Sequence, residues 1–121
     1  MGWYLKYAPI YDKFGHFFGS VTIALLSFVY VAIIGRYSKI KFDRLNTFIF
    51  IIIFTMALGG LWEIGEFVSD QLLGTMNQPS LADTMYDLIF DLIGGIFIAI
   101  LSYINFEKMK EKIITVGNNE K

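Results

Sequence analysis

Residues 48–73 decide the fold of this chain, and they read FIFIIIFTMALGGLWEIGEFVSDQLL. The segment is longer than the roughly 20 residues that an α-helix needs to cross the hydrocarbon layer of a membrane. Its second half nevertheless carries three carboxylates, those of Glu63, Glu66 and Asp70. At about 100° per residue these three lie on one stripe of a helix, which must face protein or water rather than lipid.

The next apolar segment, residues 83–106, repeats this design with Asp83, Asp87 and Asp91 at i, i+4 and i+8. Like charges at this spacing repel one another, so helix propensity does not explain their placement. The connection of residues 74–82 is short, and it predicts that the two helices form an antiparallel hairpin. Their acidic stripes then face each other at a similar depth.

Several small or polar residues mark helix ends and close contacts in this hairpin. The glycine pairs at 59–60 and 94–95 are expected to let the backbones approach closely beneath the acids. Gly74 is typical of a helix C-terminus. Ser80 is a candidate N-cap of the last helix with Asp83 in its first turn, and this cap is the alternative to a site role for Asp83.

The composition indicates a membrane protein, because 55% of the residues are hydrophobic, against about 45–50% in soluble domains. A further apolar segment at 14–35 is too long for the h-region of a signal peptide. We therefore expect an all-α integral membrane protein with one domain, 1–121, and three transmembrane helices at about 14–35, 48–73 and 83–106. Residues 1–13, which are rich in aromatics, are expected to lie in the headgroup region.

The basic residues predict the orientation of the chain. They cluster after the first span and in the tail of residues 107–121, and none lies in the connection 74–82. By the positive-inside rule that connection and the N-terminus face outward, and the basic tail is cytoplasmic. Lys6 and Lys13, on the outer side, run against this bias.

The composition argues against cysteine chemistry and against nucleic-acid binding. The chain has no cysteine, so disulfides, thiolate metal sites and cysteine nucleophiles are absent. Nucleic-acid binding is not expected, because the basic residues form two short clusters beside the membrane spans and no soluble domain remains to carry them.

No lysine or arginine lies between Arg44 and Lys108, so nothing on the last two helices can pair with their six acids. The compensating charge must come from protons, from another part of the chain or a partner, or from a bound cation. Oxygen ligands with at most one histidine favour Mg²⁺, Mn²⁺ or Ca²⁺ over Zn²⁺. We expect a divalent metal ion bound by Glu63, Glu66, Asp87, Asp91 and Asp83.

His16 and Asp70 are the candidate general bases beside this metal site. Asp12 and His16 share one helix face, which Ser20 continues inward. Asn77 and Gln78 in the connection are candidates to cover the mouth of the site, and the alternative is that these loop amides are merely solvated. The inner halves of the helices carry no ionisable group, so the site is expected to open only outward.

The hairpin resembles the YjdF-like family of uncharacterised bacterial and archaeal membrane proteins. The resemblance rests on Trp62-Glu-Ile-Gly-Glu66-Phe, on Gly74-Thr75 and on Asp83-Thr-Met-Tyr-Asp87 followed by a glycine pair. It implies a multi-pass protein of a bacterial or archaeal cell membrane, and it implies no reaction.

A wider similarity extends to the VanZ-like proteins, which are linked with glycopeptide resistance. It rests on Asp12-Lys-Phe-Gly-His16 and on Asp87-Leu-Ile-Phe-Asp91-Leu-Ile-Gly94. Aspartate here replaces an asparagine of their motif, and the basic residue between their last helices is missing. The similarity implies that His16 joins the acidic cluster.

Three functions stay open from the sequence. The first is metal-dependent chemistry on a membrane lipid or envelope precursor at an outward-facing site. The second is transport of cations or organic amines by a homo-oligomer. The third is a noncatalytic binding or assembly protein whose acids pair with a basic helix. Self-association is expected in each case, because three helices form a thin wall around six acids.

Overall fold

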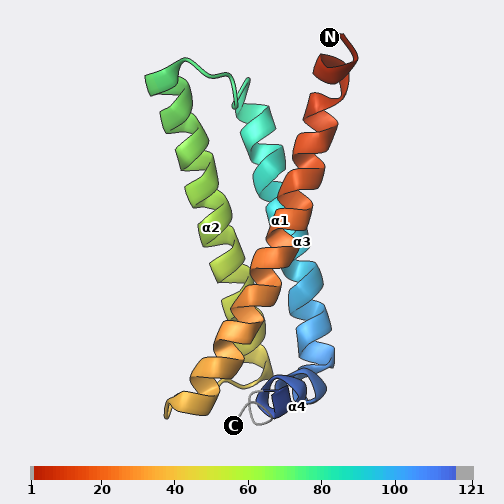
Figure 1. Ribbon diagram of the computed structural model, residues 1–121, viewed down its shortest axis with the longest axis vertical. Coiled ribbons are helices and arrows are strands. Elements are labelled where there is room, and N and C mark those ends of the chain that lie inside the picture. The colour runs from red at the N-terminus through yellow and green to blue at the C-terminus, as the bar shows by residue number, and fades with distance from the viewer. Residues whose placement is uncertain (1, 117–121) are drawn as a thin grey trace.

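A computed structural model describes residues 2–116, apart from the side chains of residues 2–9, 113, 114 and 116. This part of the chain forms four helices and no strand: α1 (Gly2–Tyr37), α2 (Arg44–Leu73), α3 (Leu81–Ile104) and α4 (Phe106–Val116). In Figure 1, α1 and α3 run downward, α2 runs upward, and the short α4 lies across the lower end. The loop between α2 and α3 is at the upper end, on the same side as the N-terminus.

The three long helices each contain a segment that is long and apolar enough to cross a membrane. These segments are Ile10–Tyr37, Arg44–Leu73 and Leu81–Ile104. The predicted all-helical class and the three candidate spans are thereby confirmed, in length and composition, for the described residues.

The helix boundaries differ from the prediction at both ends of the chain. Residues 2–13, which were expected to precede the first span, continue α1 without a break. The last span ends at Ile104 rather than at residue 106, because Asn105 caps it and donates its backbone N–H to the carbonyl of Leu101. Much of the expected tail forms α4, and residues 117–121 lie outside the described residues.

Local sequence signals explain the ends of α2 and α3. Asp43 Oδ1 accepts a hydrogen bond from the backbone N–H of Asn46 at 2.7 Å, which caps the start of α2. Gly74 ends this helix with φ at 68°, a left-handed conformation that suits glycine. Ser80 Oγ accepts from the backbone N–H of Asp83 at 3.2 Å. The predicted roles of Gly74 and Ser80 are confirmed.

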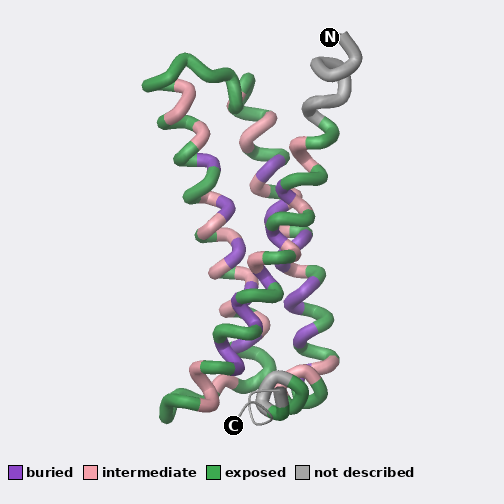
Figure 2. The backbone as a smooth tube through the Cα atoms, in the orientation of Figure 1, coloured by how far each residue is buried: buried purple, intermediate pink, exposed green. Residues whose placement is uncertain are grey.

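Buried residues follow the inner stripes of the helices, as Figure 2 shows. On α2 they recur every four residues, at Thr47, Ile51, Thr55, Gly59 and Glu63. The outward faces carry exposed large hydrophobic side chains, among them Ile53, Leu61 and Ile64. This is the pattern of helices that face lipid outside and one another inside.

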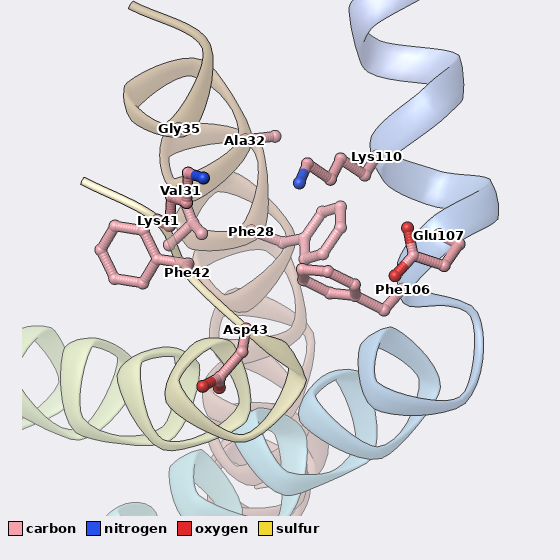
Figure 3. A pocket seen from close by; sticks show the side chains of 10 residues that line it. All are labelled: Phe28, Val31, Ala32, Gly35, Lys41, Phe42, Asp43, Phe106, Glu107 and Lys110. Carbon is pink, nitrogen blue, oxygen red and sulfur yellow. The ribbon is translucent and has the colours of Figure 1, made fainter. Parts of the chain in front are cut away.

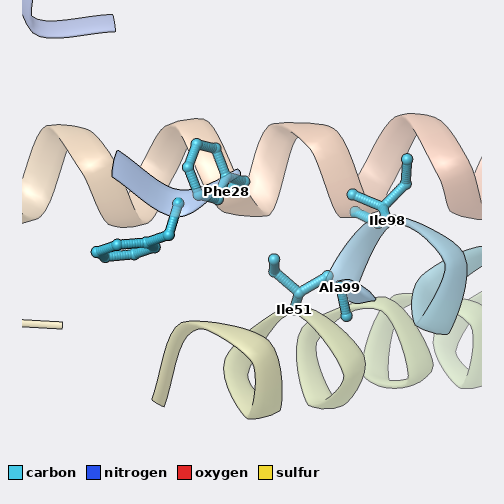
Figure 4. Close-up of a cluster of buried hydrophobic side chains, with 6 residues drawn as sticks. Phe28, Ile51, Ile98 and Ala99 are labelled. Carbon is cyan, nitrogen blue, oxygen red and sulfur yellow. The ribbon is translucent and has the colours of Figure 1, made fainter. Parts of the chain in front are cut away.

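An apolar cluster fills the middle and lower part of the bundle. Figure 4 shows Phe28, Ile51, Ile98 and Ala99 meeting there from three helices, each at most 4% exposed. This cluster separates the acid-bearing upper end from the lysine-bearing lower end.

Glycines set the close contacts above the apolar cluster. A Cβ atom on Gly59 would overlap the carboxylate of Asp91, and one on Gly94 would lie 2.8 Å from the carbonyl oxygen of Phe17. A Cβ on Gly95 would lie 3.2 Å from Thr55. The packing role predicted for these glycines is confirmed, whereas Gly60 of the same pair has open space around it.

Candidate functional site

The first helix brings a lysine into the predicted acidic cluster. Lys13 Nζ lies 2.6 Å from Asp87 Oδ1 and 2.7 Å from Asp83 Oδ1, both on α3. It also lies 3.1 Å from Oδ2 of its neighbour Asp12. The Lys13 side chain is only 15% exposed. Part of the missing positive charge therefore comes from α1.

His16 lies one turn further along α1 and faces carboxylates on both other long helices. Its Nδ1 is 3.2 Å from Asp91 Oδ1, and the tautomer with a proton on Nδ1 donates to that oxygen. Its Nε2 is 3.5 Å from Glu63 Oε1 and 3.8 Å from Asp87 Oδ1. Ser20 Oγ, the next turn inward, donates to Asp91 Oδ1 at 2.5 Å. His16 thus joins the two acidic stripes at their centre.

The second helix contributes Glu63 and Glu66 with different surroundings. Glu63 is buried, and the side-chain amide of Gln78 donates to its Oε2 at 2.7 Å and to its backbone carbonyl at 2.8 Å. Glu66 is half-buried and accepts a hydrogen bond from the indole of Trp62 at 3.0 Å. The predicted position of Gln78 at the mouth of the site agrees with its contact to Glu63.

Asp70 stabilises the loop between α2 and α3 instead of contacting the cluster. Its Oδ1 accepts from the backbone N–H of Asn77 at 2.9 Å and from the hydroxyl of Thr75 at 2.5 Å. Its Oδ2 accepts from the backbone N–H of Gln78 at 2.9 Å. These bonds satisfy the loop backbone and position Gln78 over Glu63. Both carboxylate oxygens of Asp70 therefore have hydrogen-bond partners in the loop.

The cluster remains rich in carboxylate after α1 has contributed its charges. Six carboxylates surround Lys13 and His16, which supply at most two positive charges; they belong to Asp12, Glu63, Glu66, Asp83, Asp87 and Asp91. Glu63 Oε1 and Asp91 Oδ2 are buried and have no hydrogen-bond partner among the described residues. A buried oxygen without a partner is costly, and a cation would remove that cost.

Two groups of side chains hold their ligand atoms close enough for a metal ion. One comprises Asp12, His16 and Asp87, and the other comprises His16, Glu63 and Glu66. Within each group the atoms lie within 4.8 Å of one another. The donor set of carboxylate oxygens and one imidazole fits a hard divalent cation.

Sequence reasoning missed Lys13 as a member of the cluster. Two signals were available: Lys13 runs against the positive-inside bias, and it precedes His16 by three residues, which places both on one helix face. A lysine that violates the charge bias beside a membrane span is a candidate for internal pairing.

Comparison with known proteins identifies a family but no activity. Residues 1–108 match the family described as "Predicted membrane protein (DUF2238)". An uncharacterized protein from Thermotoga maritima is 34% identical over 107 residues, which are 85% of this chain and 54% of that protein. The chain therefore spans about half the length of this relative. No solved structure matches.

The chain belongs to the DUF2238 family, and the match includes both helices on which the YjdF-like resemblance rests. The similarity to VanZ-like proteins stays a prediction.

Proposed function

We propose that this member of the family binds a divalent cation in the carboxylate cluster at the loop end of its membrane bundle. The observation that carries the proposal is the buried Oε1 of Glu63, which accepts no hydrogen bond among the described residues and has the imidazole Nε2 of His16 3.5 Å away, within an excess of carboxylates. Lys13 and His16 do not balance the cluster, so a further cation would lower its electrostatic energy.

The ligands that we propose are Asp12 and Asp87 in one group and Glu63 and Glu66 in the other, with His16 shared by both, because within each group the donor atoms lie within 4.8 Å of one another. Asp83 and Asp91 were expected as ligands from the sequence. Neither residue belongs to the two groups of close donor atoms. Asp83 contacts Lys13, and Asp91 contacts His16 and Ser20, so we assign them to holding these α1 side chains in place. Such outer contacts orient metal ligands and tune their affinity.

The site is proposed to face outward, with the α2–α3 loop outside and the lysine-rich end of the bundle in the cytoplasm. The apolar cluster of Ala24, Phe28, Ile51, Ile98 and Ala99 lies below the acids and closes the bundle toward the other end. A site with one open end suits binding and chemistry better than conduction, which needs polar groups along the whole path.

The activity that fits best is metal-dependent hydrolysis or group transfer on a lipid or lipid-linked envelope precursor. A bound metal would supply Lewis-acid polarisation of a phosphoryl or carbonyl oxygen and a more acidic water. Lys13 adds a cation beside the ligands, which can hold an anionic oxygen of the substrate. Because His16 is one of the proposed ligands and its Nδ1 faces Asp91, the role of general base would pass to a carboxylate of the cluster.

Cation transport by a homo-oligomer is the second candidate. The hydroxyls of Thr47 and Ser102 are buried without a hydrogen-bond partner among the described residues, and they lie on the stripes that continue below the acids. These hydroxyls could continue a polar path if subunits assembled around it. The third function, an assembly protein whose acids pair with a basic helix, is supported least. The helix α1 of the same chain already supplies basic side chains to these acids.

Metal content of the purified full chain tests the proposal. We expect stoichiometric metal by elemental analysis, and thermal stabilisation when the chelated protein receives Mg²⁺, Mn²⁺ or Ca²⁺. Glu63→Gln should weaken this binding by about tenfold or more. Glu107→Gln, at the opposite end of the bundle and 69% exposed, is the matched control and should bind as the parent does.

Absence of metal, together with no stabilisation by these ions or by Zn²⁺, would refute the cation site. Metal-dependent flux in proteoliposomes that Glu63→Gln abolishes would favour transport over chemistry.

A further inference from the structure

A cavity lies at the end of the bundle opposite the acidic cluster. Its volume is about 560 Å³, and its walls are the last turns of α1, the segment of residues 41–43 and the start of α4. Figure 3 shows Phe28, Val31 and Ala32 forming its apolar side. This volume is in the range of cavities that bind small molecules or parts of lipids.

The helix α4 forms one wall of this cavity and has the character of an interfacial helix. Phe106 is 6% exposed and packs edge-on against Phe28, with ring centroids 6.4 Å apart. Lys108 and Lys112 on the same helix are exposed. The helix lies across the end of the bundle in Figure 1, where an amphipathic helix would meet the headgroups.

Two amines face each other across the cavity. Figure 3 shows the side chains of Lys41 and Lys110 pointing toward the same space from opposite walls. Lys110 Nζ lies over the Phe106 ring, 5.6 Å from its centroid, which holds this side chain at the cavity. Among the described residues no carboxylate lies within ion-pair distance of Lys41 or Lys110.

The two carboxylates in the cavity wall contact other groups of the chain rather than the two lysines. Asp43 caps α2 through the backbone and side chain of Asn46, at 2.7 and 3.1 Å. Glu107 Oε1 lies 3.9 Å from a guanidinium nitrogen of Arg44. The two ammonium groups of Lys41 and Lys110 are therefore the charged groups of the wall that have no ion-pair or hydrogen-bond partner among the described residues.

We propose that this cavity binds an anionic phospholipid, whose phosphate lies between Lys41 and Lys110 and whose acyl chain contacts Phe28 and Val31. The apolar wall of the cavity complements an acyl chain, and the unpaired ammonium groups complement a phosphate. Both features lie at the end of a membrane bundle. This end carries most of the basic residues and faces the cytoplasmic leaflet if the positive-inside rule holds. The proposal does not depend on the cation site at the other end.

Lipid retention by the purified full chain in native mass spectrometry tests the proposal. With phosphatidylglycerol and phosphatidylethanolamine offered at equal concentration, we expect phosphatidylglycerol to be retained preferentially. The double variant Lys41→Ala/Lys110→Ala should lose this preference by about tenfold. The control Lys39→Ala/Lys112→Ala removes the same charge from the same two segments but leaves the cavity wall intact, so it should retain the preference.

A second variant tests the apolar part of the cavity. Gly35 lines the cavity, and a Cβ atom there would meet no atom closer than 4.0 Å, so Gly35→Leu should fold and fill the space. It should reduce phosphatidylglycerol retention although every lysine is present. Equal losses in both lysine variants, or full retention by Gly35→Leu, would overturn the proposal. Equal thermal stabilisation by inorganic phosphate would also overturn it, because the site would then not select a lipid.

Discussion

Lys13 shows how a single side chain changes the electrostatics of this protein. Its amine lies within 3.1 Å of carboxylates on α1 and α3, and its side chain is 15% exposed. A lysine in a span is expected either to reach the headgroups or to pair inside the bundle. Here it pairs, so the acids that have no cation on their own helices acquire one from another helix.

Lys13→Met should destabilise the protein by about 3 kcal/mol or more, because the buried Asp87 and the partly buried Asp83 would both lose their amine partner. Chemical unfolding in detergent, in the presence of a chelator, measures this change. Lys39→Met removes an exposed lysine and should shift the free energy of unfolding by no more than about 0.5 kcal/mol.

The double variant Lys13→Met/Asp83→Asn should recover part of the lost stability, because one of the unpaired charges is also gone. Equal stability of Lys13→Met and Lys39→Met would contradict the ion pairs described for Lys13.

At the level of the helices, Gly59 is one of the two glycines, with Gly95, on which the close contact between α2 and α3 depends. Asp91 lies directly against Gly59, and its Oδ2 is buried there without a hydrogen-bond partner. A side chain on Gly59 would push this carboxylate away and with it the contacts to His16 and Ser20. The packing of the two helices and the geometry of the cluster are therefore coupled.

Gly59→Ala should lower stability by about 1–3 kcal/mol through overpacking. Gly60→Ala, one residue further along, meets no atom within 4 Å and should be neutral or stabilising, since alanine favours the helix by roughly 0.5–1 kcal/mol. Thermal unfolding of the two variants in the same detergent compares them. A more stable Gly59→Ala protein would show that α2 and α3 do not meet as described.

At the scale of the whole molecule, the bundle has two chemically different ends. Carboxylates, Lys13 and His16 occupy the end with the α2–α3 loop, and an apolar cluster separates them from the end with α4 and its lysines. The separation of acidic from basic residues along the sequence thus becomes a separation between the two ends of the bundle. This polarity predicts which end faces the cytoplasm.

Single-cysteine labelling tests the orientation without background, because the chain has no cysteine. Met76→Cys lies in the α2–α3 loop, where Met76 is 84% exposed, and should react with a membrane-impermeant maleimide in intact cells. Lys39→Cys, between α1 and α2, should react only after permeabilisation. Labelling of both from the same side would contradict a membrane-crossing α2.

Periodicity and composition were sufficient to predict the three long helices, because a membrane span needs only a long apolar run and the acidic residues recur at helical spacing. They did not predict α4 or the extension of α1 through residues 2–13. The caps at Gly74 and Ser80 follow from local backbone chemistry, and they were predicted for the same reason. The grouping of Glu63 with Asp87 and Asp91 could also be expected, since a short connection forces the two helices together.

The pairing of Lys13 and the position of Asp70 required the arrangement of the helices in space. The contact of Lys13 with Asp83 and Asp87 joins residues 70 and more positions apart, and it depends on how α1 lies against α3. Asp70 shares the stripe of Glu63, yet its oxygens bind the loop because the chain turns back at that point. Spacing within a helix gives the face on which a side chain lies, whereas its partner depends on which other helix covers that face.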